Sequence, residues 1–582
     1  MSCLLVVLSA LVAGAVGYIQ LQPVDYAQLQ DRAGGLTLNA STSNRLAWDD
    51  GTNTLYVLAK EPARLTVFSL SFTGMLNEIA NIDLTSGARD TVGEPNHVEF
   101  CRPATPGNTA RLAISYDDPE DPSQPGTVRL YQAMSQANPT LTQIIGFSVG
   151  ANPVDMEFGL DCLRLLVANA GRPYMKLAAV NDPPGTISKV DMPGVLDTTS
   201  SPTITTIGFA LLLENPDGTD NTANLAPLMT KQFRRTPIRD NNNDVLKVTQ
   251  NMEPVSIVIA PNGQTAYVAM PKNNAIGRLN MDLDIVSEIF PLGRRSWGEF
   301  YMDASKADNA VHLENYRLYS TLQPKQVKWV VANETAWLIT LDTGFLDTIP
   351  EYGYTDYDTG MNLMSSGVIT GADAVMQAKL LDDTRLGQAH ISTVDGRDPS
   401  GANIEDIYMF GGRGISIHDG QTLDLRTSLV DNLERVSAQF YKEVFNSAFT
   451  SPTNTPQMDR DVTSPTTGPN LSVMETGFFE NVKVMFLGSG TSGMIYVYVL
   501  VPDADCPQPF FHSVYRSGGI SSSWQNMYND GSIGDIGITD MLYVGDSSDH
   551  EKLLIVTSAT SNSVSVYHVQ DNPVDLRKRN AN

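Results

Sequence analysis

The 582-residue chain has few of the residues that form metal or redox centres. It contains four cysteines and seven histidines, and none of them stands at the spacing of a zinc site or a His-Glu-x-x-His motif. No stretch beyond the N-terminus approaches the eighteen consecutive apolar residues of a membrane-spanning helix. Basic residues are also scarce: 39 Lys and Arg oppose 65 Asp and Glu, giving a net charge of -26. This balance argues against a nucleic-acid partner and makes cations the more natural ligands.

The N-terminus departs from the polar character of the chain. The run from Leu4 to Val16 is apolar, ends in small residues and is too short to span a bilayer. It predicts a signal peptide over residues 1–17 with cleavage near Gly17, although no Lys or Arg precedes the apolar run. The tail 571–582 is polar, whereas a lipid-anchor signal needs a hydrophobic end. We therefore expect a secreted, extracellular protein with no membrane span.

Short β-branched and aromatic runs separated by Gly, Pro, Asn and Asp clusters fill the remainder of the chain. A recurring phrase, an acidic or amide residue followed by Pro and an alternating run, begins at Glu94, Asn152 and Glu253, with a degenerate copy at Gly468. Pro suits the first position of a strand because no ladder donor is required there, and the alternation turns one face inward. The clearest unit, residues 257–279, predicts three strands of one antiparallel sheet.

Small antiparallel sheets repeated from end to end predict an all-β fold, and a single β-propeller is the simplest arrangement. The same cadence recurs at 45–68 and at 553–567. The chain is longer than a minimal propeller, so we expect long inserted loops or small helices at 181–250, 294–325 and 343–400. An array of β-sandwiches is the alternative, but the sequence has no linker-like breaks between independent modules.

The predicted signal peptide would remove one cysteine and leave Cys101, Cys162 and Cys506, an odd number for an oxidising compartment. Cys101 and Cys162 lie in neighbouring repeat units, so we expect these two to form a disulfide, provided that their Cα atoms lie within about 7 Å. The pairing state of Cys506 stays open. Three Asn-x-Ser/Thr sequons predict N-glycosylation; they begin at Asn39, Asn333 and Asn470.

Four segments carry a further signature, and they follow one another from the middle of the chain onward. They are Glu253-Pro254 with Ala266-Tyr267-Val268 and Asn273-Asn274-Ala275-Ile276, Ile289 to Gly293 with Asp303 to Asp308, Phe410 to Ile417, and Met458 to Asp461 with Gly468-Pro469. In this order they resemble the choice-of-anchor I family, which includes the mesenchyme-specific cell surface glycoproteins of biomineralizing animals. Colinearity makes this resemblance more specific than any single motif.

The resemblance extends over about residues 40–570 and implies a choice-of-anchor I-like domain at 18–570. It implies a propeller of about seven blades, an extracellular-matrix or cell-surface setting and a link to calcified tissue. The chain departs from the family pattern at two places, where Asn470-Leu471 replaces an acidic pair and Leu341 to Gly344 replaces an Asn-Glu-Gly-Asp strand end. Ligand contacts made by those family carboxylates are therefore not carried over.

Motifs for cofactor and hydrolase chemistry find little support. Gly488 to Gly493 satisfies the Gly-x-Gly-x-x-Gly fingerprint, but the next residues, 494–500, alternate as a strand. No helix N-terminus would then be available for a pyrophosphate, and a hairpin loop is the favoured interpretation. No Gly-x-Ser-x-Gly elbow stands on a predicted strand-to-helix turn. We therefore predict no catalytic residues.

Oxygen-rich loops suggest calcium, which accepts carboxylate, amide and backbone oxygens in flexible geometry. One candidate loop contributes Asp240, Asn242 and Asp244, but it lacks the Gly and the closing Glu of an EF-hand. The second candidate is a tyrosine-rich insertion that contributes Asp342, Asp347, Glu351, Asp356 and Asp358. A polar turn and solvated loop charge are the plainer interpretations of the two segments. We expect at most weak calcium binding.

The leading hypothesis is a secreted, acidic, non-enzymatic matrix or surface-associated glycoprotein that handles calcium or mineral in calcified tissue and contacts other matrix proteins. One alternative is a propeller-type metal-dependent phosphoesterase, since propeller loops can gather acidic metal ligands on one face. Another is a protein-binding matrix scaffold, with Trp297, Tyr352 and Trp524 as candidate anchors or core residues. The mineral phase, the tissue and the oligomeric state stay open.

Overall fold

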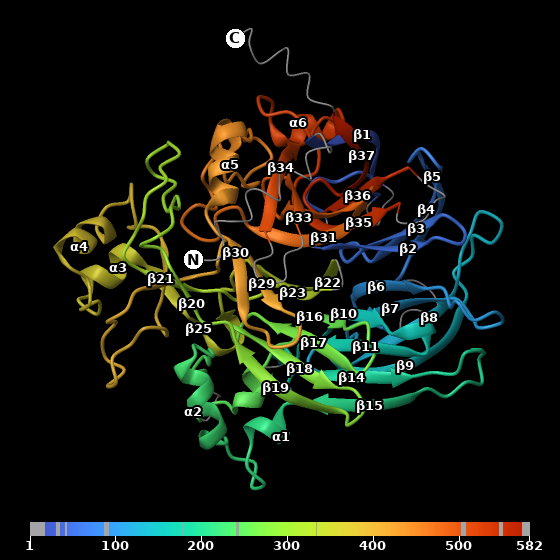
Figure 1. The fold of residues 1–582 in the computed structure, drawn as a ribbon, viewed down its shortest axis with the longest axis horizontal. Coiled ribbons are helices and arrows are strands. Elements are labelled where there is room, and N and C mark those ends of the chain that lie inside the picture. The colour runs from blue at the N-terminus through green and yellow to red at the C-terminus, as the bar shows by residue number, and fades with distance from the viewer. Residues whose placement is uncertain are drawn as a thin grey trace.

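The structure, a computed structural model, describes residues 18–30, 35–40, 43–85, 92–176, 179–239, 244–332, 335–501, 508–545 and 551–572. The chain in these ranges is built mainly from β-strands, which confirms the all-β prediction. It contains seven sheets of four antiparallel strands (Figure 1). We number them sheets 1 to 7 by the chain position of their first strands.

The strands of each sheet have the following bounds. Sheets 1 and 2 contain β2 (Asn44–Asp49), β3 (Thr54–Ala59), β4 (Arg64–Leu70) and β5 (Leu76–Asp83), then β6 (Pro95–Cys101), β7 (Arg111–Tyr116), β8 (Pro125–Gln132) and β9 (Gln143–Ala151). Sheets 3 and 4 contain β10 (Pro153–Phe158), β11 (Arg164–Asn169), β14 (Thr186–Asp191) and β15 (Thr203–Gly208), then β16 (Ser256–Ile259), β17 (Thr265–Met270), β18 (Ala275–Asn280) and β19 (Ile285–Pro291). Sheets 5 and 6 contain β22 (Gln326–Ala332), β23 (Thr335–Asp342), β29 (Gly414–Asp419) and β30 (Leu425–Leu429), then β31 (Leu471–Phe479), β32 (Val482–Ser489), β33 (Met494–Val501) and β34 (Gln508–Arg516). Sheet 7 contains β35 (Ile538–Val544), β36 (Leu553–Ser558), β37 (Ser563–Asn572) and β1 (Tyr18–Gln28).

The first strands of the seven sheets form a closed circuit. Strands β2, β6, β10, β16, β22, β31 and β35 each contact the next in this order, and β35 contacts β2. Strand β1 completes sheet 7 by pairing with β37, from Tyr18 opposite Asn572 to Gln28 opposite Ser563. The first and last strands therefore lie side by side; they are the blue and red strands at the top of Figure 1.

Burial follows the order of the strands within a sheet. All six residues of β3 and of β36 are buried, because the second strand of a sheet is covered on both faces by its neighbours. The fourth strands β5 and β15 are mostly exposed or half-buried. The first strands therefore lie at the centre of the circuit and the fourth strands lie at its rim.

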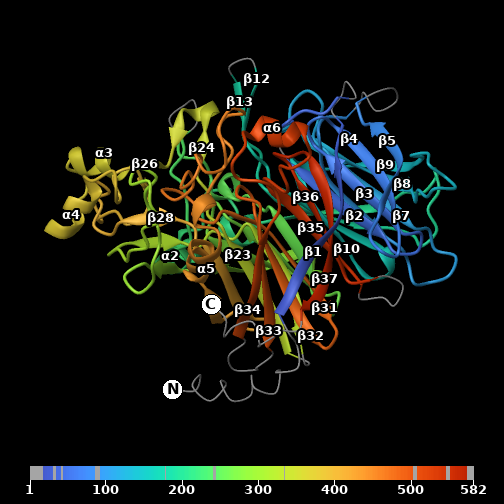
Figure 2. The ribbon, with the colours of Figure 1, turned by 90° about the horizontal axis from the view of Figure 1, so that it is seen from above.

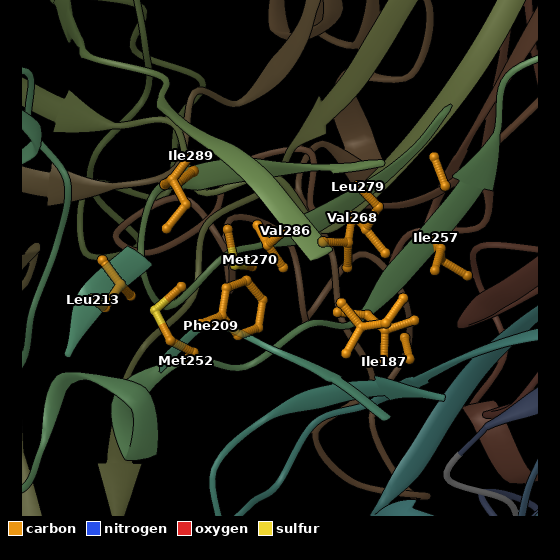
Figure 3. Packing of buried hydrophobic residues seen from close by; sticks show 14 of the residues in the cluster. Ile187, Phe209, Leu213, Met252, Ile257, Val268, Met270, Leu279, Val286 and Ile289 are labelled. Atoms are coloured by element: carbon orange, nitrogen blue, oxygen red, sulfur yellow. The ribbon is translucent and has the colours of Figure 1, made fainter. Parts of the chain in front are cut away.

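Apolar packing between neighbouring sheets holds the circuit together. Between sheets 3 and 4, Ile187 of β14 packs in one cluster with Val268 of β17, and Leu213 of helix α1 (Ala210–Leu213) covers the same cluster (Figure 3). The labelled side chains come from both sheets and point toward one another (Figure 3). Each fully buried aliphatic side chain contributes about 1.5–3 kcal/mol. This packing fixes the position of each first strand.

Insertions between the sheets carry the remaining elements. The small sheets contain β12 (Tyr174–Lys176) with β13 (Ala179–Asn181), β20 (Arg294–Ser296) with β21 (Tyr319–Thr321) and β28 (Tyr408–Phe410), β24 (Thr348–Ile349) with β25 (Tyr354–Thr355), and β26 (Tyr357–Thr359) with β27 (His390–Ser392). The other helices are α2 (Thr222–Thr230), α3 (Gly360–Ser365), α4 (Ala374–Leu380), α5 (Asn432–Phe440) and α6 (Trp524–Asn529), with 3-10 turns at Leu160–Cys162, Val248–Asn251, Pro350–Tyr352 and Lys442–Val444.

The insertion prediction for 181–250 is partly wrong. Strands β14 and β15 belong to sheet 3, so the inserted segment begins only after Gly208. The insertions predicted at 294–325 and 343–400 agree with the structure, and helices α3 and α4 lie outside the sheets in both views (Figures 1 and 2). Within these insertions, Trp297 packs with Leu363 and Met376 in a hydrophobic cluster of their own.

The predicted hairpin loop and the predicted disulfide can both be compared with the structure of the sheets. The Gly488 to Gly493 segment joins β32 to β33, which pair antiparallel, so the hairpin prediction is confirmed.

Cys101, at the end of β6, forms a disulfide with Cys162 across a Cα–Cα distance of 5.7 Å. The bond ties sheet 2 to the turn between the first two strands of sheet 3. Among the described residues, none of the helices has the length and apolar character needed to cross a bilayer.

Candidate functional site

The Pro-led phrase of the sequence forms the first strands of the sheets. It begins β6 at Pro95 and β10 at Pro153, and its degenerate copy leads into β31. The second and fourth residues after Pro95 and after Pro153 face the centre of the circuit. On β6 these are His97 and Glu99, and on β10 they are Asp155 and Glu157. The alternation predicted from the sequence therefore presents polar groups, rather than apolar ones, at the axis.

Several of these side chains connect one sheet to the next. The carboxylates of Asp155 and Glu157 accept hydrogen bonds from the backbone amides of Ile257 and Ile259 on β16, each at 2.9 Å. Asp540 on β35 accepts one from Leu46 on β2, also at 2.9 Å. A first strand has no strand partner on its axial edge, and an unpaired buried amide is costly. The axial carboxylates supply the missing acceptors.

These residues surround a cavity of about 410 Å³, which we call the waist, lined by residues from all seven first strands. Its five carboxylates are Glu99, Asp155, Glu157, Glu475 and Asp540. Lys328 of β22 forms an ion pair with Glu475. Burial raises the pKa of Glu157 to about 8, and the neighbouring Asp155 adds to the effect. The waist is thus an acidic passage in which burial raises the pKa of Glu99, Asp155, Glu157 and Asp540 above their ordinary values.

His97 lies among these acids without carrying charge. Its Nδ1 atom is 3.1 Å from Oδ1 of Asp155, and its Nε2 atom is 3.6 Å from Oε2 of Glu99. Burial, helped by the positive charge of Arg45, lowers the pKa of His97 to about 3. Burial also raises the pKa of Asp155 to about 6. The imidazole is therefore a neutral polar group in the wall of the waist.

A second cavity, of about 500 Å³, lies where the first strands begin, and we call it the mouth. Its charged residues are Arg45, Lys60, Arg172 and Lys325, and none of its lining residues is acidic. An apolar wall is formed by Val154, Val255, Pro271, Phe345 and Leu346. The mouth and the waist are lined by successive residues of the same strands, such as Arg45 and Leu46 on β2. Along the axis, the charged lining residues therefore change from basic in the mouth to mainly acidic in the waist between one strand residue and the next.

The four cations of the mouth differ in their partners. Lys60 donates to Oδ1 of Asn96 at 2.6 Å, and Arg172 lies 3.6 Å from Oε2 of Glu253. Arg45 donates to the carbonyl of Thr539 at 3.3 Å, while its buried Nε atom has no hydrogen-bond partner among the described residues.

Lys325 stands apart from the other three cations. Its ammonium has neither a hydrogen bond nor an ion pair to any residue that the structure describes. The side chain is open to solvent inside the mouth, yet the surrounding walls lower its pKa to about 8, and the charges of Arg45 and Arg172 contribute.

The structure divides the acids of the tyrosine-rich insertion among buried cations. Asp356 accepts a hydrogen bond from Nη2 of Arg234 at 2.5 Å, and Asp347 lies 3.6 Å from the ammonium of Lys272. Among the acids of the insertion whose side chains the structure describes, only Asp347 and Asp356 are brought together, since the Asp356 carboxylate accepts a hydrogen bond from the Asp347 amide at 3.0 Å. Burial raises the pKa of Asp356 to about 6.

The other predicted calcium ligands lie apart from this pair. Asp342 accepts from the hydroxyls of Thr340 and Ser416, with Arg295 at 3.8 Å. Asp358 is partly exposed and accepts from Asn362 at 2.8 Å. Asp244 is exposed; Asp240, Asn242 and the Glu351 side chain lie outside what the structure describes. Among the described residues, no group of three or more His, Cys, Asp and Glu side chains is arranged to hold a metal ion.

The predicted glycosylation sites, Cys506 and the candidate aromatic anchors differ in where the structure places them. Asn39 is exposed, whereas Asn470 is half-buried and lines the mouth; Asn333 and Cys506 lie outside the described residues. Of the two interpretations of Trp297 and Trp524, the structure supports core residues over surface anchors, because both side chains are buried in hydrophobic clusters. Tyr352 is half-buried and packs against a small cluster beside β24.

Comparison with known proteins adds an independent view. Residues 44–502, more than half of the chain, match the Choice-of-anchor I domain. The mesenchyme-specific cell surface glycoprotein of Strongylocentrotus purpuratus is 24% identical over 317 residues, which are 51% of this chain and 40% of that protein. Gigasin-3a of Magallana gigas is 26% identical over 197 residues, 33% of this chain and 68% of that protein. The chain thus spans less than half the length of the sea urchin relative.

Solved structures are similar only at a distance. The Cps50 (Swd1) β-propeller domain of Myceliophteria thermophila is 7% identical and aligns over 94% of this chain and all of that one, with a TM-score of 0.39. A putative 6-phosphogluconolactonase of Bacteroides fragilis is 9% identical over 93% of this chain and 94% of that one, also with a TM-score of 0.39. Scores this low carry no argument, and the fold rests on the strand pairing described above. The match over residues 44–502 is decisive for classification: the chain belongs to the choice-of-anchor I family.

Proposed function

We propose that the chain is a non-enzymatic extracellular glycoprotein, associated with a cell surface or matrix, that acts by binding. In this proposal the seven sheets are the blades of a single propeller. The observation that carries it is convergence: side chains from the beginnings of six first-strand regions, far apart in the sequence, meet around one solvent-accessible cavity at the axis. Pockets assembled in this way are typical of binding sites held by a rigid scaffold.

Several features support an extracellular setting. The N-terminal sequence has the pattern of a signal peptide. The disulfide between Cys101 and Cys162 suits an oxidising compartment, and the sequon at Asn39 is on an exposed segment. The sea urchin relative is named a cell surface glycoprotein.

A second proposal is that the protein handles calcium. It is supported by acidic side chains away from the axis rather than by the cavities at the axis. Asp197 and Asp217 are exposed and Asp398 is half-buried, and hydrogen bonds from nearby hydroxyl groups lower the pKa of each, so they carry charge at any physiological pH. Together with the net charge of -26 they favour many loose contacts with Ca²⁺. The acids of the tyrosine-rich insertion contribute less, since Asp347 and Asp356 already face Lys272 and Arg234. The same pairing removes the support for a metal-dependent phosphoesterase at that insertion.

Expression of the full chain in animal cells tests the main proposal. We expect the protein in the medium, beginning near residue 18, with a mass that falls after glycosidase digestion. Retention of the unprocessed chain inside the cells would contradict the extracellular assignment. Calcium calorimetry tests the second proposal separately: several sites with dissociation constants on the order of 10⁻⁴ to 10⁻³ M are expected, and one tight site would overturn it.

A further inference from the structure

We infer that the mouth binds a small organic oxyanion, that is, a carboxylate, sulfate or phosphate group carried on a compact apolar body. The ligand would place its charged group among Arg45, Lys60, Arg172 and Lys325 and its apolar part against the wall that contains Phe345. This inference goes beyond the proposed surface role and does not rest on calcium handling.

The first argument is the local reversal of charge. Acidic residues outnumber basic ones by 65 to 39 in the chain, yet the lining of the mouth has four basic residues and no acidic one. Two of the four have neighbouring acids, Asp117 at 3.9 Å from Lys60 and Glu253 at 3.6 Å from Arg172. Glu253 is itself engaged by Lys272 at 2.7 Å. The cavity therefore retains an excess of positive charge that its own walls do not neutralise.

The second argument is unused hydrogen-bonding capacity. Lys325 has three N–H donors and no partner among the described residues, and the buried Nε of Arg45 has none either. Leaving the buried Nε donor of Arg45 unpaired is costly, and an ionised oxygen is the acceptor that compensates best. The ammonium of Lys325 faces the solvent in the mouth, so it is accessible to the same ligand. These two residues come from sheets 1 and 5, so one oxyanion between them would be bound from two directions.

The third argument is size and shape. A volume of about 500 Å³ lies within the range of small-molecule sites, and one wall is apolar. Inorganic anions would leave that wall unused, because its favourable contribution requires apolar surface to be buried. A ligand with an aromatic or aliphatic body matches the cavity better.

The waist supplies the fourth argument, because it limits how far an anion can enter. Asp155 and Asp540 follow the mouth along the axis, and the charge of Arg45 lowers the pKa of both from the values that burial would otherwise give them. Beyond Arg45 an anion meets Asp155, whose pKa of about 6 leaves it ionised at neutral pH, and is repelled. The charged head of the ligand is therefore held in the mouth, next to Lys325.

Titration calorimetry on the full secreted chain, after enzymatic removal of N-glycans, tests this inference. The probes are phenyl phosphate, phenyl sulfate, benzoate and inorganic phosphate, at neutral pH and low salt. We expect one site for phenyl phosphate, weaker binding of inorganic phosphate, and weakening by added salt. The order of affinity among the three organic probes identifies which oxyanion the site prefers. Absence of binding for all three organic probes would overturn the inference.

Variants locate the site. Lys325→Gln should weaken phenyl phosphate binding about tenfold or more, because a charge-assisted hydrogen bond is lost, whereas Lys325→Arg should retain most of the affinity. The control Lys231→Gln removes one exposed positive charge next to α2 and should change nothing. If Lys325→Gln does not fold, as judged by thermal unfolding, Arg172→Gln replaces it. Binding that is equally strong in the Lys325 or Arg172 variant and in the Lys231 control would refute the site.

Discussion

The carboxylate of Glu157 on β10 accepts a hydrogen bond from the backbone amide of Ile259 on β16 at 2.9 Å. The two residues belong to neighbouring sheets and are 102 positions apart in the chain. The bond satisfies an amide on the axial edge of a strand that has no strand partner there. The acidic lining of the waist is therefore part of the structure of the ring as well as a surface of the passage.

The burial of this carboxyl group predicts a pH-dependent stability that Glu157→Gln should alter. Burial, helped by Asp155, raises the pKa of Glu157 from 4.5 to about 8, while the hydrogen bond from Ile259 and the charge of Lys328 oppose the rise. The folded state thus keeps a proton that the unfolded state releases, so this contribution is complete below pH 4.5 and is lost as the pH rises toward 8. In Glu157→Gln the free energy of unfolding should fall less steeply over this interval, as measured by urea titration. Glu288→Gln, at an exposed position, should keep the slope of the parent.

Two neighbouring aspartates of the tyrosine-rich insertion should respond differently to the same substitution. Asp356→Asn weakens a buried ion pair with Arg234, which keeps Asp395 at 2.9 Å, and we expect a loss of about 2–3 kcal/mol. Asp358→Asn removes the same charge from a partly exposed site, so the change should stay within about 0.5 kcal/mol. Urea unfolding of the two variants measures the difference. Equal effects would contradict the assignment of Asp356 to a buried pair.

The disulfide provides a prediction about sheets 2 and 3. Cys101 and Cys162 close a loop with a sequence separation of 61, and the chain-entropy account assigns such a loop about 4 kcal/mol. Replacing both cysteines by serine should lower the free energy of unfolding by an amount of that order. Dithiothreitol should destabilise the parent to a similar extent and should have no further effect on the double variant.

The sequon at Asn470 links glycosylation to the mouth. Asn470 lines that cavity, so a glycan on its side chain would occupy or cover the space in which we place the oxyanion. In protein from animal cells with its glycans intact, Asn470→Gln should bind phenyl phosphate more tightly than the parent. Asn39→Gln, which removes a sequon on an exposed segment, should not. After glycosidase digestion the difference between the parent and Asn470→Gln should disappear; a persistent difference would point to the side chain itself.

The all-β fold could be predicted from the sequence because the patterns that indicate its strands are local. Pro95 and Pro153 mark the beginnings of strands, and the alternation after each predicts the strand. The same phrases place Glu99 and Glu157 at the polar positions of the alternation, at the fourth residue after each Pro. This repeated acidic position is the signal that could have revealed the waist.

The mouth could not be predicted in this way. Arg45 and Lys325 are separated in sequence by the other strands of sheet 1 and by all of sheets 2, 3 and 4, and they stand in unrelated sequence contexts. Only the closure of the circuit brings them together. Conversely, Asp347 and Asp356 are close in sequence, which suggested a shared ion. Buried cations from distant segments, Lys272 and Arg234, take up their charge instead. Sequence proximity of like charges says nothing about such long-range partners.

The seam between β1 and β37 also determines how the molecule would bear mechanical load. Tyr18 and Asn572 are paired at one end of this seam, so a force that separates them acts on one hydrogen-bonded pair at a time. Such peeling requires less force than shearing the whole seam from Tyr18 to Gln28. A protein under tension between these two positions would open first in sheet 7. Tension between a ligand in the mouth and residue 572 would instead be transmitted through the packed sheets. It would not pull on β1.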